Sequence, residues 1–422
     1  MKNIKFAIKT FGCKVNQYDS QVIRENLEKL GCFETAFDEA DVIIINSCTV
    51  TGMADTKTRR FTRKIRKENS KARIMVTGCS VVYPKDIAVF ESMPGVDKVI
   101  PNEEKLRIPL IINDLYGISD DVPVIREEVS GFHSHTRAFL KIQDGCDQGC
   151  SYCKVSKVRG PLRSRPKLDI MDELARLLDA GYKEVVFSGI CIGSWKGHNR
   201  ETLSDILHDV DSIDRDFRLR ISSIEPNHIT RDILEIMARS SKICQHLHIP
   251  LQSGSDKILA LMKRRYNVSQ FRELIVDIRS KLPFAGITMD IISGFPGETE
   301  EDFLQTIEFI KEIKPSRLHV FRYSDREGTA SFEMIPKVGK ETAKKRVGSL
   351  IDIGNNLQEV FAKRFIGQEI EILIEKRTKD NQCTGYTREY VQVSVDDDIV
   401  VPGELVRVKP TSIDEKSHCL SI

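Results

Sequence analysis

The sequence predicts an α/β protein with two successive parallel α/β units followed by a small antiparallel β-barrel. Apolar strand-like runs alternate with segments of helical apolar spacing from the start of the chain to about residue 362. Turn residues interrupt this alternation at 113–135, and beyond residue 365 only short strands with glycine turns remain. We therefore expect three domains, at residues 1–120, 132–362 and 365–422.

The composition limits the classes of function. Lysine and arginine together number 64 against 62 aspartate and glutamate, so the net charge of +2 gives no general attraction to nucleic acid or membrane. The first residues lack the features of a signal peptide, and no apolar run approaches the roughly 18 residues of a membrane helix. We expect a cytoplasmic monomer without membrane contact. Its 11 cysteines would stay reduced there, which favours metal ligands or catalytic groups over disulfides.

Three strand candidates of the first domain each end in a turn residue and a cysteine. Segments whose apolar residues have helical spacing separate these runs, which indicates that the strands are parallel. Side chains beyond the carboxyl ends of such strands meet at one edge of the sheet. A lone cysteine there is commonly a small buried side chain, but three in the same context indicate a shared ligand. The runs are 5–13 ending at Cys13, 40–48 ending at Cys48 and 72–79 ending at Cys79.

A strongly basic stretch at 56–73 lies between the second and the third of these cysteines. It contains hardly any acidic residue and has helical spacing. A phosphate-rich substrate is one interpretation, and a solvated helix face is the other. Arg59, Arg60 and Arg63 are the residues that we expect to contact phosphate.

Six strand candidates alternate with helices in the second domain. Right-handed repetition of strand and helix gives a parallel sheet, and six repeats predict a partial (β/α)6 barrel. The helix predicted at 299–313 begins with Thr299 and Asp302 in capping-box spacing. The strands are expected at 137–142, 183–189, 217–223, 243–250, 286–294 and 316–321.

The stretch DGCDQGCSYCK, residues 144–154, follows the first of these six strands. Its cysteines, Cys146, Cys150 and Cys153, have the spacing C-x3-C-x2-C. A closed zinc site needs four ligands and a disulfide needs an even number of cysteines. Three thiolates can instead hold three irons of a [4Fe–4S] cluster and leave the fourth iron open to a small molecule. We therefore expect a catalytic cluster on the rim of the barrel.

In the third domain, apolar and polar residues alternate as in the strands of a small antiparallel barrel. Such barrels often bind RNA through basic and aromatic side chains, although an accessory barrel without RNA contacts is an alternative. The acidic run Asp396–Asp398 is expected to form a turn that faces away from phosphate. The candidates for RNA contact are Tyr386, Arg388, Tyr390, Arg407 and Lys409.

The cysteine motif after the first strand of a parallel barrel resembles the signature of radical S-adenosylmethionine enzymes. In those enzymes the open iron chelates the amino and carboxylate groups of the cofactor's methionine part, and an electron splits the sulfonium to give a 5′-deoxyadenosyl radical. Further segments resemble the methylthiotransferase family, and they are closest to its threonylcarbamoyladenosine tRNA branch. These segments are GCKVNQYDS, NSCTV, VTGC, TRAFLKIQDGC, HLHIPLQSGSDKIL, GFPGETEEDF, SRLHVFRYSDREGT and GYTREYVQV.

The resemblance implies a specific reaction, the insertion of a methylthio group at C2 of N6-threonylcarbamoyladenosine at tRNA position 37. The product would be 2-methylthio-N6-threonylcarbamoyladenosine. The C2 hydrogen is not acidic enough for a side-chain base, which agrees with radical chemistry. One molecule of S-adenosylmethionine would donate its methyl group and another would form the radical. Implied partners are tRNA, an electron donor such as flavodoxin or ferredoxin, and a source of sulfide.

The resemblance also implies ligands and cofactor contacts. Cys146, Cys150 and Cys153 would hold the [4Fe–4S] cluster that binds S-adenosylmethionine. The first-domain cysteines would hold an auxiliary [4Fe–4S] cluster, and the C-terminal domain would be a TRAM domain. Arg159, Arg163 and Arg165 follow the motif and are candidates for contact with phosphate or cofactor, Arg163 foremost. The other implied cofactor contacts are Tyr152, Ser188, Gly189, Ser223, Glu225, Gln252 and Ser253.

The chain departs from the family at two places. Many members have an isoleucine-proline pair after the third cysteine, where this chain reads KVSKVRG, and Cys191 stands where asparagine or histidine is commoner. We expect both changes to affect substrate fit and no cluster ligand. Alternative substrates are N6-isopentenyladenosine in tRNA and a ribosomal-protein aspartate, the latter disfavoured by GCKVN and the basic stretch. A further alternative is a non-catalytic iron–sulfur protein that binds RNA or senses redox state. It is disfavoured because such a protein would not need the six-stranded barrel.

Overall fold

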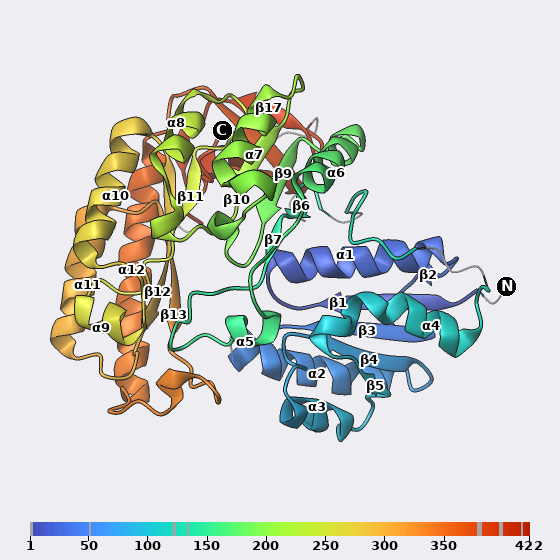
Figure 1. Ribbon diagram of the computed structural model, residues 1–422. Coiled ribbons are helices and arrows are strands. Elements are labelled where there is room, and N and C mark those ends of the chain that lie inside the picture. Colours follow the sequence, from blue (N-terminus) through green and yellow to red (C-terminus); the bar gives the residue numbers. More distant parts are fainter. Residues whose placement is uncertain are drawn as a thin grey trace. The chain divides into compact units, whose positions relative to one another are not determined.

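The chain forms two compact units in this computed structural model (Figure 1). The first unit contains residues 1–130, 144–147 and 153–161, and the second contains 131–143, 148–152 and 162–422. Within the described part of the chain, no helix is both long and apolar enough to cross a membrane. The acidic run Asp396–Asp398 lies outside the described residues. These are 3–49, 52–120, 124–132, 135–377, 382–395, 400–414 and 417–422.

A five-stranded parallel sheet forms the centre of the first unit. Its strands are β1 (Lys5–Thr10), β2 (Phe33–Glu34), β3 (Val42–Ser47), β4 (Arg73–Gly78) and β5 (Lys98–Val99). Its helices are α1 (Lys14–Lys29), α2 (Gly52–Glu68), α3 (Pro84–Glu91) and α4 (Ile108–Tyr116). The strand order is β2-β1-β3-β4-β5, so the three strands that precede cysteines are direct neighbours.

Helices cover both faces of this sheet, as the sequence of β3 requires. The strand reads VIIINS and is buried along its whole length. Ile44 packs in the same apolar cluster as residues of α1 and α4. Ile43 and Ile45 point to the opposite face, where the cluster includes Ile65 of α2 and Phe90 of α3.

The second unit contains six parallel strands in two three-stranded sheets, β10-β9-β6 and β11-β12-β13. Isolated parallel bridges, such as that between Ser223 and His248, connect β10 to β11. The six predicted strands and the partial barrel are therefore confirmed. The strands are β6 (Ala138–Lys141), β9 (Glu184–Ser188), β10 (Arg218–Ile221), β11 (His246–His248), β12 (Gly286–Ser293) and β13 (Arg317–Arg322).

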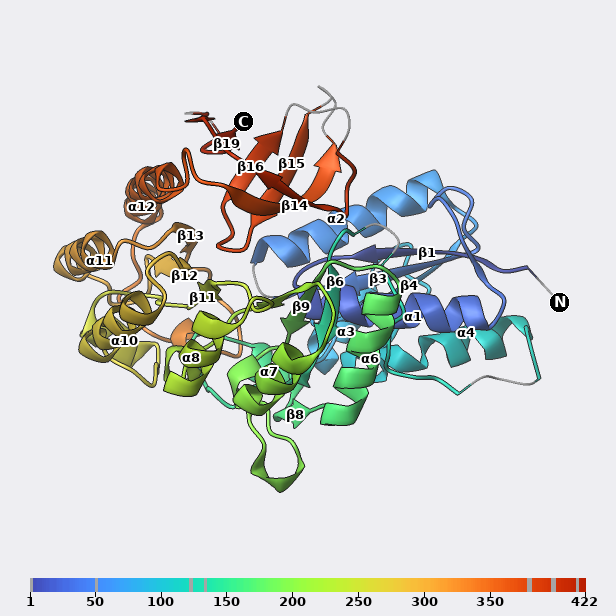
Figure 2. The same ribbon diagram turned by 90° about the horizontal axis from the view of Figure 1, so that it is seen from above.

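Helices follow the strands and pack on the outside of the barrel (Figure 2). The capping box predicted for α11 is present, since Asp302 N donates to Thr299 Oγ1 at 3.2 Å and Thr299 N donates to Asp302 Oδ2 at 2.9 Å. The helices are α6 (Lys167–Asp179), α7 (Leu203–Ser212), α8 (Arg231–Arg239), α9 (Asp256–Leu261), α10 (Val268–Lys281), α11 (Glu300–Ile313) and α12 (Lys340–Lys363).

The C-terminal strands form a six-stranded sheet in the order β17-β14-β15-β16-β19-β18. All its pairs are antiparallel except β16 with β19. Phe361 and Phe365, at the end of α12 and just beyond it, join the core of this sheet. The strands are β14 (Ile370–Arg377), β15 (Cys383–Thr387), β16 (Gln392–Val395), β17 (Leu405–Val408), β18 (Ser412–Ile413) and β19 (Leu420–Ser421).

A buried charge cluster holds the C-terminal sheet at the amino ends of the barrel strands. The carboxylate of Glu184, the first residue of β9, lies 3.2 Å from Arg137, 2.6 Å from Arg218 and 2.8 Å from Arg220. Arg218 and Arg220 also donate to backbone carbonyls of residues 386–388. Burial alone would raise the pKa of Glu184, but the positive charges of the arginines lower it well below its usual range.

Aromatic rings cover this charge cluster. The ring of Tyr390 stacks on His246 and on Tyr386, with centroid separations of 4.7 Å in both pairs. The guanidinium of Arg137 lies 5.2 Å from the centroid of each tyrosine ring. Because one carboxylate serves three arginines, the cluster depends on Glu184 more than on any single arginine.

We predict that Glu184→Gln lowers the free energy of unfolding by about 3–5 kcal/mol, because it leaves buried guanidinium groups without their shared counter-charge. The native carboxylate is ionised down to low pH, so its stabilising contribution is fully present at neutral pH, begins to fall as the pH drops below the usual glutamate pKa, and is gone only below the lowered native pKa. Urea unfolding followed by fluorescence of Trp195, the single buried tryptophan, measures the loss. The control is Glu312→Gln in the exposed pair with Arg272. Equal stability of the two variants would contradict the prediction.

Candidate functional site

The three cysteines of the first unit lie at adjacent strand ends. Backbone hydrogen bonds join these ends, from Phe11 N to Asn46 O at 2.9 Å and from Cys79 N to Ser47 O at 3.1 Å. Gly12 has a φ of +104°, and a Cβ atom there would lie 2.5 Å from Cys48 Sγ. The loop before Cys13 therefore packs directly against Cys48.

Asn16 in the first turn of α1 connects these loops. Its Nδ2 donates to Phe11 O at 2.9 Å and to Ser47 O at 2.7 Å, and its Oδ1 lies 3.9 Å from Cys79 Sγ. One buried amide thus contacts the strand ends that carry the cysteines. This residue was not among the site residues predicted from the sequence.

Arg159 connects the same region to the segment that carries Cys146 and Cys153. The arginine ends α5 (Val155–Arg159) and is 4% exposed. Its Nη1 donates to Asp19 at 3.2 Å and to Asp144 at 3.0 Å, and its Nη2 donates to Asn16. Arg159 therefore has carboxylate and amide partners inside the protein, and its contact with phosphate or cofactor stays a prediction.

Lys105 is the second buried cation of this cluster. Its Nζ lies 2.5 Å from Asp19 Oδ2 and 3.1 Å from Asn102 Oδ1. Burial raises the pKa of the Cys79 thiol, and the positive charges of Arg159 and Lys105 oppose this shift. The two cations therefore favour the thiolate, which is the form that binds metal.

Cys150 belongs to the second unit, where Arg264 approaches it. Arg264 Nη1 lies 3.2 Å from Cys150 Sγ and 3.5 Å from Tyr152 Oη, and Nη2 donates to Glu225. Burial raises the pKa of Glu225, and the charge of Arg264 opposes this. Arg264 thus brings together a cysteine of the motif and two predicted cofactor contacts, Tyr152 and Glu225.

The remaining predicted cofactor contacts, apart from Arg163, lie at the carboxyl ends of the barrel strands. Ser188 is buried and its Oγ donates to Leu140 O at 3.3 Å, and Gly189 packs closely against Gln143. Ser223 is half-buried beside β11, and Arg163 is exposed after the motif. Their binding of a cofactor stays a prediction.

Gln252 is the strand-end residue whose environment best fits a ligand. It is buried with a φ of +66°, and its Oε1 has no hydrogen-bond partner among the described residues. The neighbouring Ser253 instead lies 3.3 Å from Thr306 Oγ1, inside the protein. A buried amide oxygen without a protein partner is suited to accept a hydrogen bond from a bound molecule.

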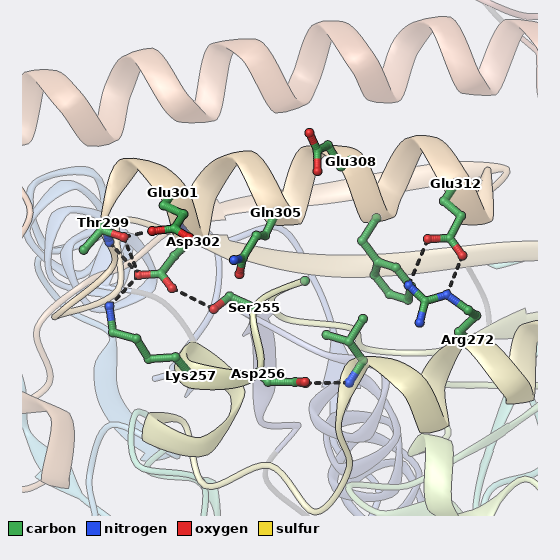
Figure 3. Close-up of a pocket in the computed structure, with 13 residues that line it drawn as sticks. Ser255, Asp256, Lys257, Arg272, Thr299, Glu301, Asp302, Gln305, Glu308 and Glu312 are labelled. Carbon is green, nitrogen blue, oxygen red and sulfur yellow. Dashed lines mark hydrogen bonds and ion pairs between the residues drawn. The ribbon is translucent and has the colours of Figure 1, made fainter.

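A groove of about 680 Å³ lies on the outside of the barrel between α10 and α11 (Figure 3). Ser255 Oγ donates to Asp302 at 2.8 Å, and Lys257 lies 2.6 Å from the other oxygen of the same carboxylate. The pair between Arg272 and Glu312 closes the far end. These partners satisfy one another, so we assign no ligand to the groove.

The predicted RNA contacts have different environments. Arg59, Arg60 and Arg63 are exposed on α2, as are Arg407 and Lys409 on and just beyond β17. Tyr386 is half-buried in the stack with Tyr390, and Arg388 donates to Ile243 O at 3.0 Å. Tyr386, Arg388 and Tyr390 therefore have structural contacts with the barrel, and RNA binding by any of the predicted residues stays a prediction.

The cysteines outside the two triads are buried, as expected for structural residues. Cys191 lies 3.7 Å from Gln148 Nε2, next to the motif, and its backbone N donates to Gln143 Oε1 at 2.7 Å. Burial raises the pKa of Cys32 to about 11. All eleven cysteines lie in the described part of the chain, and none of them forms a disulfide there. The five are Cys32, Cys191, Cys244, Cys383 and Cys419.

Both cysteine triads fit an iron–sulfur cluster by the chemistry of their donors. Each offers three thiols that form no disulfide, and each has an arginine nearby, Arg159 for the first and Arg264 for the second. Sequence patterns could not reveal Arg264, since it lies in a loop more than a hundred residues from Cys150.

Three family models match the sequence. The "Radical SAM superfamily" matches residues 140–310, the "Uncharacterized protein family UPF0004" matches 5–101, and the "TRAM domain" matches 363–417. Among solved structures, "radical S-adenosylmethionine methyltransferase, TsrM, from Kitasatospora setae", with cobalamin and a [4Fe–4S] cluster bound, has a TM-score of 0.58 at 13% identity. This likeness covers 79% of this chain and 77% of that chain and concerns the fold alone.

Curated relatives match nearly the whole chain. "Threonylcarbamoyladenosine tRNA methylthiotransferase MtaB" of Thermotoga maritima is 36% identical over 99% of this chain and 97% of the relative, and the protein of that name from Bacillus subtilis is 37% identical over 96% and 93%. "tRNA-2-methylthio-N(6)-dimethylallyladenosine synthase" of Carboxydothermus hydrogenoformans is 34% identical over 97% of both chains. Because the relatives from Thermotoga maritima and Bacillus subtilis match nearly the whole chain and share more than a third of its residues, the chain belongs to the radical S-adenosylmethionine methylthiotransferase family.

Proposed function

We propose that this protein inserts a methylthio group at C2 of N6-threonylcarbamoyladenosine at tRNA position 37. The observation that carries the proposal is a pair of cysteine triads, one at adjacent strand ends of a parallel sheet and one after the first barrel strand, in a chain that matches tRNA methylthiotransferases along its length. Its cofactors are two [4Fe–4S] clusters and S-adenosylmethionine. When bound, they supply reductive cleavage of S-adenosylmethionine and delivery of sulfur.

We assign the two clusters to different triads. Cys146, Cys150 and Cys153 would hold the cluster that binds S-adenosylmethionine. Arg264 then keeps the side chains of Tyr152 and Glu225 next to Cys150. The auxiliary cluster would be held by the triad of the first unit, which consists of Cys13, Cys48 and Cys79.

Substrate RNA would bind through exposed cations, because phosphate contacts depend on accessible lysine and arginine. Arg59, Arg60 and Arg63 on α2 and the pair Arg407 and Lys409 in the C-terminal sheet meet this condition. We further propose that the protein works as a monomer in the cytoplasm, with an electron donor such as flavodoxin or ferredoxin and with a source of sulfide.

A second candidate function is methylthiolation of N6-isopentenyladenosine in tRNA. It is favoured by the likeness to the synthase of Carboxydothermus hydrogenoformans, whose printed name specifies the dimethylallyl substituent, at 34% identity. The first candidate is preferred because the relatives from Thermotoga maritima and Bacillus subtilis have higher identity.

Removing either triad should abolish methylthio transfer but affect S-adenosylmethionine cleavage differently. The reconstituted wild-type protein is expected to hold about eight irons, and each triple alanine variant about four. The Cys13, Cys48 and Cys79 variant should still form 5′-deoxyadenosine with reductant, because the barrel triad is intact. The Cys146, Cys150 and Cys153 variant should form none. Iron analysis and chromatography of 5′-deoxyadenosine measure both effects, and cleavage lost equally in two folded variants would refute the assignment.

The substrate is tested with one tRNA sequence in two forms and with ribosomal protein. We expect methylthiolation of tRNA that carries N6-threonylcarbamoyladenosine, and little or none of the same tRNA with N6-isopentenyladenosine. Mass spectrometry of digested nucleosides detects the 2-methylthio products. Turnover of the isopentenyl form alone would establish the second candidate, and modification of the ribosomal protein with tRNA untouched would reject both.

A further inference from the structure

A row of polar side chains crosses β11, β12 and β13. Thr288 Oγ1 lies 3.1 Å from His246 Nε2 and 2.8 Å from His248 Nδ1. Asp290 Oδ2 lies 3.2 Å from His248 Nε2, and Asp290 Oδ1 lies 3.4 Å from His319 Nδ1. The strand register places His248 opposite Thr288, and Asp290 opposite His319. The row is therefore a direct consequence of strand pairing.

The row faces the inside of the barrel. Thr288 and Asp290 alternate along β12 with fully buried apolar residues, among them Met289. On β13 the neighbour of His319 that faces the other way is Leu318, which packs against Gly354 of the outer helix α12. The exposed side-chain fraction rises along the row, from 15% for His248 through 25% for Asp290 to 37% for His319. His319 is therefore the accessible end of the row.

The carboxylate of Asp290 determines which nitrogen of His319 is available. Burial alone would raise the pKa of Asp290, but hydrogen bonds from His248 and His319 lower it well below its usual range. Because the carboxylate accepts the Nδ1 proton of His319, it fixes the orientation of the ring. In that tautomer Nε2 carries the lone pair, and no described residue forms a hydrogen bond to it, so Nε2 can accept a hydrogen bond from a donor on a bound molecule.

The row is in contact with the predicted cofactor residues through the backbone. Gln252 N donates to Asp290 O at 2.8 Å, and Ile224 N, between Ser223 and Glu225, donates to His248 O at 3.0 Å. Two residues beyond His319 on β13 and on the same face, Phe321 is 40% exposed. An accessible aromatic ring beside a hydrogen-bond acceptor is a surface on which a nucleobase can stack.

We propose that His319 is a specificity residue, whose Nε2 accepts a hydrogen bond from the hydroxyl of the substrate's N6-threonylcarbamoyl group. The isopentenyl group has no hydroxyl, so this contact is lost with that substrate. The inference rests on the proposed function, because it assumes tRNA with the threonylcarbamoyl modification as the substrate. Phe321 supplies the stacking surface for the adenine.

The same side chains could in principle hold a divalent cation, since their ligand atoms lie within 4.8 Å of one another. The contacts favour hydrogen bonding. Each histidine approaches a different oxygen of Asp290, whereas a single ion would draw both imidazoles toward one point. The metal content of the variants distinguishes the two cases.

The test compares His319→Ala and His319→Gln with wild type as full-length reconstituted protein. The matched control is His208→Ala, which removes an exposed histidine 3.2 Å from Asp232 on the outer helices. The probes are one tRNA with N6-threonylcarbamoyladenosine and the same tRNA with unmodified adenosine at that position. Dissociation constants are measured without reductant, and KM and kcat with reductant. Trp195 fluorescence confirms that each variant is folded.

In wild type, the threonylcarbamoyl form should bind more tightly than the unmodified form. We expect His319→Ala to reduce this advantage by about 3- to 10-fold, the effect of one hydrogen bond between neutral groups. KM for the modified tRNA should rise by a similar factor. The amide of His319→Gln should restore part of the advantage. Formation of 5′-deoxyadenosine without tRNA and binding of unmodified tRNA should stay unchanged, and His208→Ala should resemble wild type.

An unchanged advantage in folded His319→Ala would overturn the inference and leave the proposed function intact. Loss of about one non-cluster metal per chain in that variant would also overturn it, in favour of an ion site. If wild type neither prefers nor modifies the threonylcarbamoyl form, the proposed function fails, and the inference fails with it.

Discussion

A single buried guanidinium connects the two cysteine-bearing segments of the first unit. Arg159 follows the C-x3-C-x2-C motif in the sequence, yet its partners are Asn16 and Asp19 of α1 together with Asp144. With Lys105, the cluster contains two cations and two carboxylates, so the desolvation of each charge is offset by an opposite one. A buried network of this kind tolerates few arrangements, because an unpaired charge would cost several kcal/mol. The cysteine loops on either side of it are constrained accordingly.

The two ends of the barrel in the second unit have different roles. Its carboxyl ends carry Cys150, Tyr152, Glu225 and Gln252, the residues that we assign to the cofactor. At its amino ends Glu184 and its three arginines hold the C-terminal sheet. Between the two ends, the row from His246 to His319 crosses the interior. The aromatic residues of the C-terminal sheet therefore contribute to the stability of the barrel, in addition to any contact with RNA.

The sequence was sufficient to predict those structural features that depend on local patterns. Apolar runs and their turn residues predicted the parallel sheet of the first unit and the six parallel strands of the second, and the position of Cys13, Cys48 and Cys79 at strand ends followed from the same pattern. Side chains that meet only through the fold could not be predicted. Arg264 and Cys150 are 114 residues apart, and Arg159 resembles an exposed arginine in sequence although it is buried. Charged residues at the start of β9 and β10 are unusual in buried strands and can be recognised in the sequence. No local pattern, however, indicates that Arg218 and Arg220 share Glu184.

The central claim, that Arg159 holds the two cysteine-bearing segments in a fixed arrangement, is tested most directly by electron paramagnetic resonance of the reduced, reconstituted protein. Both clusters are then paramagnetic, and the interaction between their spins depends on their separation. The account predicts a defined spin–spin interaction in wild type, which is weakened or broadened in Arg159→Gln at unchanged iron content. It also predicts no change in Lys157→Gln, which alters an exposed lysine of the same helix α5. An unaltered interaction in Arg159→Gln would contradict the account.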